Sequence, residues 1–174
     1  YVGGLRVELP HDLVTILAED DKVLFALRRE YPDPANEGQT YTTTWFDMWT
    51  MEDGKLAEHW DTATLGEGQD LLPESEGGPI PVTGVTGEAQ LALLEHADPQ
   101  VAANKRIAYD VWRSIVEAGR EDLAPQWIHE DYIQHNPNAA TGRAGMQAYF
   151  ATRPDLPIQE YVQRPIVDIV GEGD

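Results

Sequence analysis

Two short motifs place ionisable side chains beside large aromatic ones. Residues 58–61 (EHWD) end a strand-like stretch near the start of the chain, and residues 131–137 (DYIQHNP) follow a helical stretch near its end. Imidazole, carboxylate and aromatic groups together suit the wall of a pocket that is partly apolar and partly reactive. Such a pocket could bind a small molecule and move a proton on it.

The first motif contains the candidate base. Side chains alternate between the two faces of a strand, so His59 and Asp61 point the same way, with the small residues Ala57 and Ala63 beside them. We interpret Asp61 as a general base that removes a proton α to a carbonyl, with His59 or His135 as its proton partner or as a donor to the enolate oxygen. The alternative is that His59 is a rim residue and Asp61 an ordinary carboxylate at a strand end.

The other candidate residues would line the pocket. His135 stands where an extended stretch meets a turn, and its alternative role is a structural hydrogen bond. Asp47 lies in the middle of an aromatic strand, where a carboxylate must be paired, solvated or protonated, so it is a secondary acid–base candidate. The aromatic residues form either core or pocket wall. The predicted substrate-binding residues are Trp45, Phe46, Asp47, Trp49, Trp60 and Asn136.

Metal and cofactor chemistry is weakly indicated. His59, Asp61 and His135 have the composition of a site with two histidines and one carboxylate, but no tight ligand spacing such as HExxH is present. The sequence contains no GxSxG elbow, no phosphate-binding loop, no dinucleotide fingerprint and no cysteine. We therefore predict chemistry without a cofactor and without a metal.

Charge restricts the partners. The chain has 31 Asp and Glu against 12 Lys and Arg, a net charge of -19. This charge repels phosphate backbones and anionic lipid, so nucleic acid and membrane surfaces are not expected partners, and a small-molecule ligand is. The acidic surface is either ordinary solvated surface or an adaptation to high salt. No signal peptide is visible at Tyr1, which favours a cytoplasmic location, unless a leader has been removed.

The first third of the chain predicts an antiparallel meander. Two short apolar runs separated by acidic residues indicate a hairpin, a loop rich in proline follows, and Asp53-Gly54 marks the turn between two longer strands. The predicted strands are 13–17, 23–27, 41–51 and 56–64, and the predicted loop is 31–39.

The remainder predicts a linker and then helices. Residues 66–87 are rich in Gly, Pro, Glu and Ser, a linker composition. A short helix is expected at 88–96, and a stronger one from its N-cap Asn104 to its stop Gly119, with apolar residues 107, 108, 111, 112, 115 and 116 on one face. Further helices are expected at 122–129 and 142–151, and a strand at 160–170. Strands first and helices later indicate an α+β fold.

An internal repeat links the two ends. Residues 11–21 (HDLVTILAEDD) align with residues 164–174 (RPIVDIVGEGD), with identity at Val14/Val167, Ile16/Ile169, Glu19/Glu172 and Asp21/Asp174. Apolar alternation is common in strands, so chance agreement is the alternative. If the repeat is real, the chain ends at the hairpin turn where its first sheet begins.

The motifs resemble one family in reverse order. Residues 104–174, with NKRIAYDVW, HEDYIQHNP and PIVDIVGEGD, resemble the first half of a SnoaL-like polyketide-cyclase domain, a relative of ketosteroid isomerase. Residues 1–65, with TTTWFDMWTMEDGKLAEHWD, resemble its second half, and residues 66–103 would be the linker. The resemblance implies a cone: a curved antiparallel sheet wrapped by helices around a pocket. It also implies a permuted domain or an excerpt from a tandem protein.

Two function classes follow from these observations. One is a cofactor-independent enzyme for aldol condensation, cyclisation or isomerisation of a small carbonyl or polyketide-like compound. The other is a non-catalytic binding or dimerisation module of the same fold. We also expect the helices of 104–151 to pack on the sheet. Edge strands at 5–17 and 160–170 predict a homodimer, with swapping as one route to it.

Overall fold

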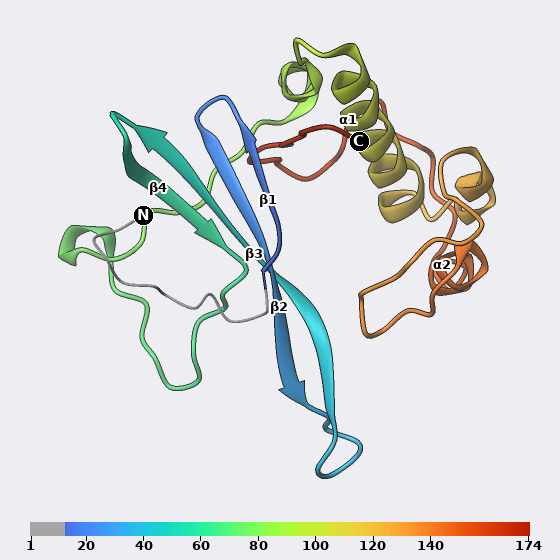
Figure 1. Ribbon diagram of the computed structural model, residues 1–174, viewed down its shortest axis with the longest axis horizontal. Helices are drawn as coiled ribbons and strands as arrows, with labels where there is room; N and C mark the ends of the chain where they lie inside the picture. Colours follow the sequence, from blue (N-terminus) through green and yellow to red (C-terminus); the bar gives the residue numbers. More distant parts are fainter. Residues whose placement is uncertain (1–12) are drawn as a thin grey trace. The chain divides into compact units, whose positions relative to one another are not determined.

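The computed structural model describes residues 13–174, which form two compact units. The first contains residues 13–62 together with 135–137, and the second contains residues 63–134 and 138–174. Strands make up the first unit and helices the second, as Figure 1 shows, so the predicted α+β class is confirmed.

The first unit is a four-stranded antiparallel meander. Its strands are β1 (Leu13–Glu19), β2 (Lys22–Pro32), β3 (Thr40–Glu52) and β4 (Lys55–Asp61), hydrogen-bonded in the order β1-β2-β3-β4. The predicted hairpin and the three strand connections are therefore confirmed. β2 and β3 are longer than predicted because their backbone pairing continues to the partners Pro32 and Thr40, beyond the residues that bury side chains. β4 is shorter than the predicted strand 56–64, because it ends at Asp61, the partner of Asp47.

The two tight turns use residues that tolerate a left-handed backbone. Asp20 has φ 52° between β1 and β2, and Asp53 and Gly54 have φ 50° and 72° between β3 and β4. Two consecutive positive φ values give the turn the right-handed twist of its flanking strands. The Asp-Gly signal therefore predicts this hairpin correctly from local chemistry alone.

The sheet has little core of its own. Ala26 is the one buried apolar residue in the sheet among the described residues, and Val14, Ile16, Phe46 and Leu56 are exposed. A sheet with half-buried side chains on both faces needs a second layer to shield them.

The longest helix, α1 (Pro99–Val111), begins earlier than predicted. Its N-cap is Asp98, whose carboxylate accepts a hydrogen bond from the Gln100 amide at 2.8 Å, and Pro99 supplies a helical φ without needing a hydrogen-bond partner. Asn104, the predicted N-cap, lies inside the helix. The prediction was wrong because the buried stripe already starts at Val101, one turn before Asn104.

The buried face of α1 also differs from the predicted one. Val101, Lys105 and Tyr109, spaced four residues apart, are buried, whereas Ile107 and Trp112 are exposed. The helix continues as a π-helical turn, Trp112–Glu117, and stops at the predicted Gly119. Gly119 has φ 72°, and a Cβ there would meet the Pro154 carbonyl oxygen at 2.7 Å, so only glycine fits.

Two apolar clusters form the core of the second unit. Leu94, Tyr109 and Val162 make the first, and Ile115, Ala124 and Met146 make the second. Tyr132 packs against the second cluster. Besides α1, the elements are 3₁₀ helices Glu74–Glu76, Gly87–Leu94 and Glu121–Gln126 and the short helix α2 (Arg143–Phe150).

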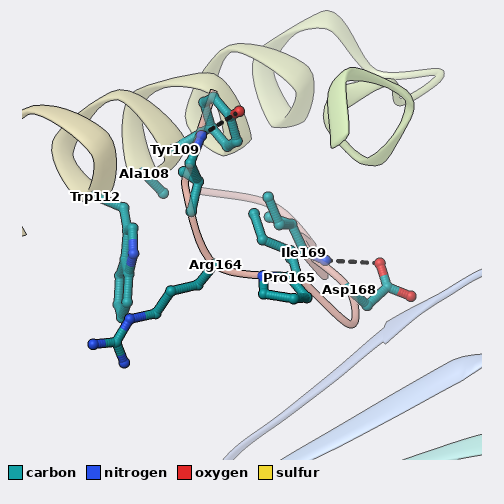
Figure 2. A pocket seen from close by; sticks show the side chains of 9 residues that line it. Ala108, Tyr109, Trp112, Arg164, Pro165, Asp168 and Ile169 are labelled. Atoms are coloured by element: carbon teal, nitrogen blue, oxygen red, sulfur yellow. Dashed lines mark hydrogen bonds between the residues drawn. The ribbon is translucent and has the colours of Figure 1, made fainter. Parts of the chain in front are cut away.

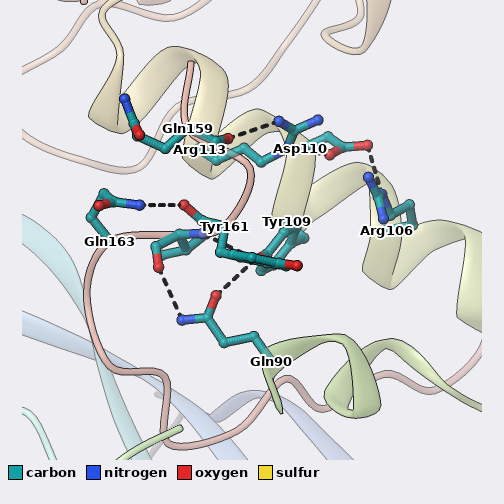
Figure 3. A network of polar contacts seen from close by, with 9 residues as sticks. Gln90, Arg106, Tyr109, Asp110, Arg113, Gln159, Tyr161 and Gln163 are labelled. Carbon is teal, nitrogen blue, oxygen red and sulfur yellow. Dashed lines mark hydrogen bonds and ion pairs between the residues drawn. The ribbon is translucent and has the colours of Figure 1, made fainter. Parts of the chain in front are cut away.

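A buried glutamine ties three segments of this unit together. Gln90 Nε2 donates to the carbonyl oxygens of Val162 and Arg164 at 3.1 and 3.0 Å, and Gln90 Oε1 accepts from the Tyr109 hydroxyl at 2.7 Å. The same hydroxyl accepts from the Val162 amide at 3.0 Å. Figure 3 shows Gln90 reaching between α1 and the segment that contains Tyr161. The segment around Val162 is thus held against α1 by buried polar contacts.

The predicted strand at residues 160–170 does not form. That stretch has one isolated antiparallel bridge, between Val85 and Ile166, and is otherwise irregular. Its alternating apolar residues are directed against the cluster of Leu94 and Tyr109, and a strand needs a neighbouring strand as well as the pattern. The predicted strand at 5–17 is β1 from Leu13, and the residues before it lie outside the described part.

No helix within residues 13–174 has both the length and the apolar character needed to cross a lipid bilayer.

Candidate functional site

The central contact of the candidate site joins two neighbouring strands. His59 Nε2 on β4 lies 3.1 Å from Asp47 Oδ1 on β3. The side chain of Asp47 is 16% exposed and that of His59 is 48% exposed, so the carboxylate lies under the imidazole, which remains open to solvent. The sequence named both residues as candidates, and the sheet brings them together.

Asp61 completes a cluster of three ionisable groups. It is the Cα partner of Asp47 in the β3–β4 pairing, and one ligand atom from each of Asp47, His59 and Asp61 lies within 4.8 Å of the others. We call these three residues the His59 cluster. A spacing of this kind is compatible with one divalent ion, but exposed carboxylates commonly gather without a metal, and two of the three residues are exposed.

Aromatic rings support the imidazole. The ring of Trp49 stacks on His59 with centroids 5.3 Å apart and an interplanar angle of 12°. Phe25 on β2 contacts Trp49 edge-on, with ring centroids 4.9 Å apart. His59 is therefore restrained both by a hydrogen bond and by stacking, which fixes the plane of its ring.

The same face of the sheet continues away from the cluster as a row of rings and one cation. The Arg29 guanidinium lies 4.9 Å from the ring centroid of Trp45, and Tyr31 stacks on Tyr41 at 5.9 Å. Trp45, Asp47 and Trp49 alternate along β3 and so share this face. We call it the histidine face, defined by Phe25, Arg29, Trp45, Asp47, Trp49, His59 and Asp61.

Two predicted wall residues lie on the opposite face. Phe46 pairs with Ala26, and Trp60 pairs with Met48, so all four point away from the histidine face. Strand alternation makes it impossible for Phe46 and Asp47, or for Trp60 and His59, to line the same surface of this sheet. The sequence predicts that Trp45, Phe46, Trp49 and Trp60 all line the pocket. The strand register places only Trp45 and Trp49 of these four on the histidine face.

The second motif lies in an irregular part of the chain. His135 and Asn136 are exposed and lie outside any helix or strand, although residues 135–137 group with the sheet in the first unit. The sequence analysis considered His59, Asp61 and His135 as a set of metal ligands. In the structure the third residue close to His59 and Asp61 is Asp47.

The contact between Asp47 and His59 restricts the tautomer of the imidazole. When Asp47 is an ionised carboxylate it only accepts hydrogen bonds, so the contact then requires a proton on Nε2 of His59. The lone pair of Nδ1 is then left for another molecule. A neutral imidazole oriented by a carboxylate through its N–H is a suitable general base, because the carboxylate stabilises the imidazolium that forms.

Phe25 and Arg29 are members of the histidine face that sequence reasoning missed. Their signal was present in β2, where apolar and basic residues continue the alternation of residues 23, 25 and 27 to Arg29. Only the pairing of Phe25 with Asp47 and of Leu27 with Trp45 shows that this face of β2 lies beside the aromatic residues of β3.

The second unit has a cavity of its own, of about 350 Å³. It lies between α1 and the chain near the C-terminus and is lined mainly by apolar groups, with Arg164 and Asp168 as the charged residues (Figure 2). Figure 2 shows the side chains of Trp112 and Arg164 at one end and Asp168 at the other, its carboxylate bonded to the Ile169 amide at 2.7 Å. The volume falls in the range of small-ligand pockets.

Comparisons of the chain with protein-family models, with curated proteins and with solved structures found no match.

Proposed function

We propose that the histidine face binds a small carbonyl compound and that the His59 cluster moves a proton on it. The observation that carries the proposal is the Asp47–His59 hydrogen bond of 3.1 Å under a ring stacked on Trp49. A histidine restrained by a carboxylate and an aromatic ring, and left half open to solvent, has the arrangement expected of a group that reacts with a bound molecule.

The proposed step is proton abstraction next to a carbonyl. Nδ1 of His59 accepts the proton from the α-carbon. The electron pair of the broken C–H bond forms a C=C bond, and the π pair of the carbonyl moves onto its oxygen to give an enolate. The positive charge that develops on His59 is offset by Asp47 and Asp61. In an α,β- or β,γ-unsaturated ketone, return of the proton from His59 to another carbon of the conjugated enolate completes an isomerisation. When the enolate carbon instead forms a C–C bond to a second carbonyl, the alkoxide produced takes the proton from His59, which completes an aldol addition or cyclisation.

Aromatic neighbours would hold the substrate. Trp45 and Trp49 are half-buried and flank Asp47 along the same face of β3, so an unsaturated ring system can stack against them. Arg29 lies over Trp45 and can donate to a carbonyl or carboxylate oxygen. These contacts favour a flat, oxygen-bearing molecule of the polyketide type.

We further propose that the chain adopts the cone of SnoaL-like proteins, with the two units as the two halves of one domain. The motif resemblance of residues 1–65 and 104–174 and the antiparallel meander support this proposal. The cone would cover the half-buried faces of the sheet, which have little core of their own.

Binding without catalysis is the second candidate. It is favoured by the exposure of the cluster, because a 48% exposed imidazole and an exposed Asp61 are solvated by water that weakens electrostatic catalysis. In that case the aromatic row alone would carry the function.

The test is hydrogen–deuterium exchange at the α-carbon of small ketones and β-diketones, followed by NMR in D₂O. We expect the protein to accelerate exchange, and His59→Ala to reduce the acceleration by a factor of about 100 to 10,000, the usual effect of losing a positioned proton-transfer group. Asp61→Asn distinguishes the two candidate bases. If Asp61→Asn reduces the acceleration of exchange more than His59→Ala does, Asp61 is the base.

His129→Ala is the matched control, since His129 is an exposed histidine of the second unit. It should leave exchange unchanged. If no compound exchanges faster than in buffer, while the same compounds still quench tryptophan fluorescence, the catalytic proposal fails and the binding module stands.

A further inference from the structure

The cavity between α1 and residues 162–169, here named the Trp112 cavity, belongs to the second unit and takes no part in the function proposed for the histidine face. Its volume is about 350 Å³. Ala108 and Trp112 line it from the helical side, and their spacing of four residues places them on one face of the helix. Ile166 and Ile169 line it from the other side. Both sides are apolar, as Figure 2 shows.

Hydrogen bonds within the second unit hold the two sides of the Trp112 cavity in place. The Tyr109 hydroxyl on α1 donates to Gln90 Oε1 at 2.7 Å and accepts from the Val162 amide at 3.0 Å. Further along the chain, the backbone groups of Val85 and Ile166 pair in both directions, at 2.9 and 3.0 Å. The cavity is therefore formed before any ligand arrives, which lowers the entropic cost of binding.

Several backbone groups in the wall already have hydrogen-bond partners. The carbonyl oxygens of Val162 and Arg164 accept from Gln90 Nε2 at 3.1 and 3.0 Å, and Ile166 uses both of its backbone groups in the bridge. The polar groups that are left to orient a ligand include the two charged side chains of the lining, Arg164 and Asp168. An apolar cavity with a few polar groups at defined places is the usual form of a small-molecule site.

Arg164 is the cation of this site. Two other arginines of the second unit, Arg106 and Arg113, both pair with Asp110. The Arg164 guanidinium, in contrast, makes no ion pair or hydrogen bond with any residue in the range 13–174. Figure 2 shows its side chain extending to the end of the cavity where Trp112 lies. A guanidinium with its donors available is suited to binding a carboxylate through two parallel hydrogen bonds.

Trp112 and Asp168 restrict the rest of the ligand. Trp112 is 47% exposed, so its indole ring offers a flat apolar surface beside Arg164 on which another ring can stack. Asp168 lies at the opposite end, where its negative charge repels a second acidic group. The volume is near the lower end of the range for small-ligand pockets, which limits the ligand to one or two rings.

We propose that the Trp112 cavity binds a small planar monocarboxylate, an aromatic acid of one or two rings. Its carboxylate pairs with Arg164, its ring stacks on Trp112, and the far edge of the ring lies against Ile166 and Ile169. This site is independent of the His59 cluster, because every residue that lines it belongs to the second unit.

Isothermal titration calorimetry of the full chain with 2-naphthoate, a planar acid with one carboxylate, tests the proposal. We expect Arg164→Gln to weaken binding about tenfold, the usual effect of losing a hydrogen bond to a charged group. Arg120→Gln is the matched control. It removes the same charge from the second unit, at a surface pair with Asp122, and should leave the affinity unchanged.

Filling the cavity is a second, independent test. Ala108→Leu adds a side chain where the ligand ring would lie, so we expect it to abolish detectable binding. Ala103→Leu is the matched control, because Ala103 is also an exposed residue of α1 but does not line the cavity. Leucine is a good helix former, so both variants should keep their helical circular dichroism.

A third arm tests the end at Asp168. The diacid 2,6-naphthalenedicarboxylate should bind roughly threefold more weakly than 2-naphthoate, a difference of the size expected for charges near the surface. Asp168→Asn should remove this difference, and it keeps the oxygen that accepts from the Ile169 amide.

Several outcomes would overturn the proposal. Absence of binding at millimolar 2-naphthoate is one, and equal affinity for the neutral 2-naphthalenemethanol or for the diacid is another. A loss of binding in Arg29→Gln but not in Arg164→Gln would place the acid on the histidine face instead. A dimer in sedimentation that Ala108→Leu dissociates would show that a second copy covers the cavity. None of these results changes the α-carbon exchange assay, which reports on His59.

Discussion

At the scale of single residues, a few buried polar side chains hold segments of the second unit together through hydrogen bonds. Gln90 and Ser114 are almost completely buried, and Gln90 uses both ends of its amide. A hydroxyl or amide removed from water contributes to stability only while its partners stay in place, because an orphaned partner retains the full cost of desolvation. These residues should therefore be sensitive to substitutions that barely change volume.

Tyr109→Phe tests this sensitivity. The substitution leaves the Val162 amide and Gln90 Oε1 without the hydroxyl that now bonds both, so we expect a loss of about 2 kcal/mol in the free energy of unfolding. Urea denaturation followed by circular dichroism measures it. Tyr149→Phe is the control: its ring contacts with Phe150 and Arg153 are retained, and a change below about 0.5 kcal/mol is expected. Equal effects of the two substitutions would contradict the role assigned to the network.

At the scale of elements, α1 is held by charge as well as by apolar contacts. Asp110 lies between Arg106 and Arg113 at 2.9 and 2.7 Å, and Arg113 also reaches the Gln159 carbonyl at 3.1 Å. Burial acts to raise the pKa of Asp110, but the hydrogen bonds from the two guanidinium groups outweigh it, and the pKa lies below the ordinary 3.8. The ionised form of Asp110 is thus more favoured in the folded chain than in the unfolded chain.

Acid should remove this contribution. Because the pKa of Asp110 is lower in the folded than in the unfolded chain, its stabilisation is complete above the unfolded value of 3.8 and is lost as the pH falls through the folded value. We expect Asp110→Asn to cost roughly 1 to 2 kcal/mol at pH 7, a difference that shrinks below about pH 4. Thermal unfolding of both proteins from pH 7 to pH 3 measures it. Asp122→Asn, whose exposed carboxylate pairs with Arg120, should change stability less; a constant Asp110→Asn difference down to pH 3 would contradict the assignment.

At the scale of the whole molecule, the two units differ in how well they are packed. Both apolar clusters lie in the second unit, whereas the sheet buries one apolar residue in its described part. A single sheet needs a partner layer, while helices packed around two clusters already have one. Stability should therefore be unevenly divided between the units.

Separate fragments test the division. A fragment of residues 63–174 keeps every member of both clusters and the Gln90 network, so we expect it to unfold cooperatively on heating, as followed by circular dichroism. A fragment of residues 1–62 should show a broad, weakly cooperative transition or self-associate through its uncovered faces. Cooperative unfolding of the sheet fragment as a monomer would show that the sheet does not need a second layer.

The sequence by itself determined the parts of this protein that depend on neighbouring residues. Asp53-Gly54 specifies its turn, Gly119 its helix end, and the alternation of residues 13–61 the order and pairing of four strands. It also named Asp47, His59 and Asp61, because ionisable groups stand out in an aromatic strand. It failed where two signals competed locally, as at Asp98 and Asn104, and only helix geometry decided between them.

The tertiary structure decided which of those residues meet. Asp47 and His59 are twelve residues apart and touch because the β3–β4 register makes Asp47 the partner of Asp61 and sets Trp49 against His59. Gln90 and Val162 are 72 residues apart, and no local pattern predicts their hydrogen bond. The strand predicted at 160–170 pairs with the described chain only at the single bridge between Val85 and Ile166, so an alternation like that of β1 leaves it irregular. Periodicity records which face of an element is apolar, but only long-range packing selects what that face contacts.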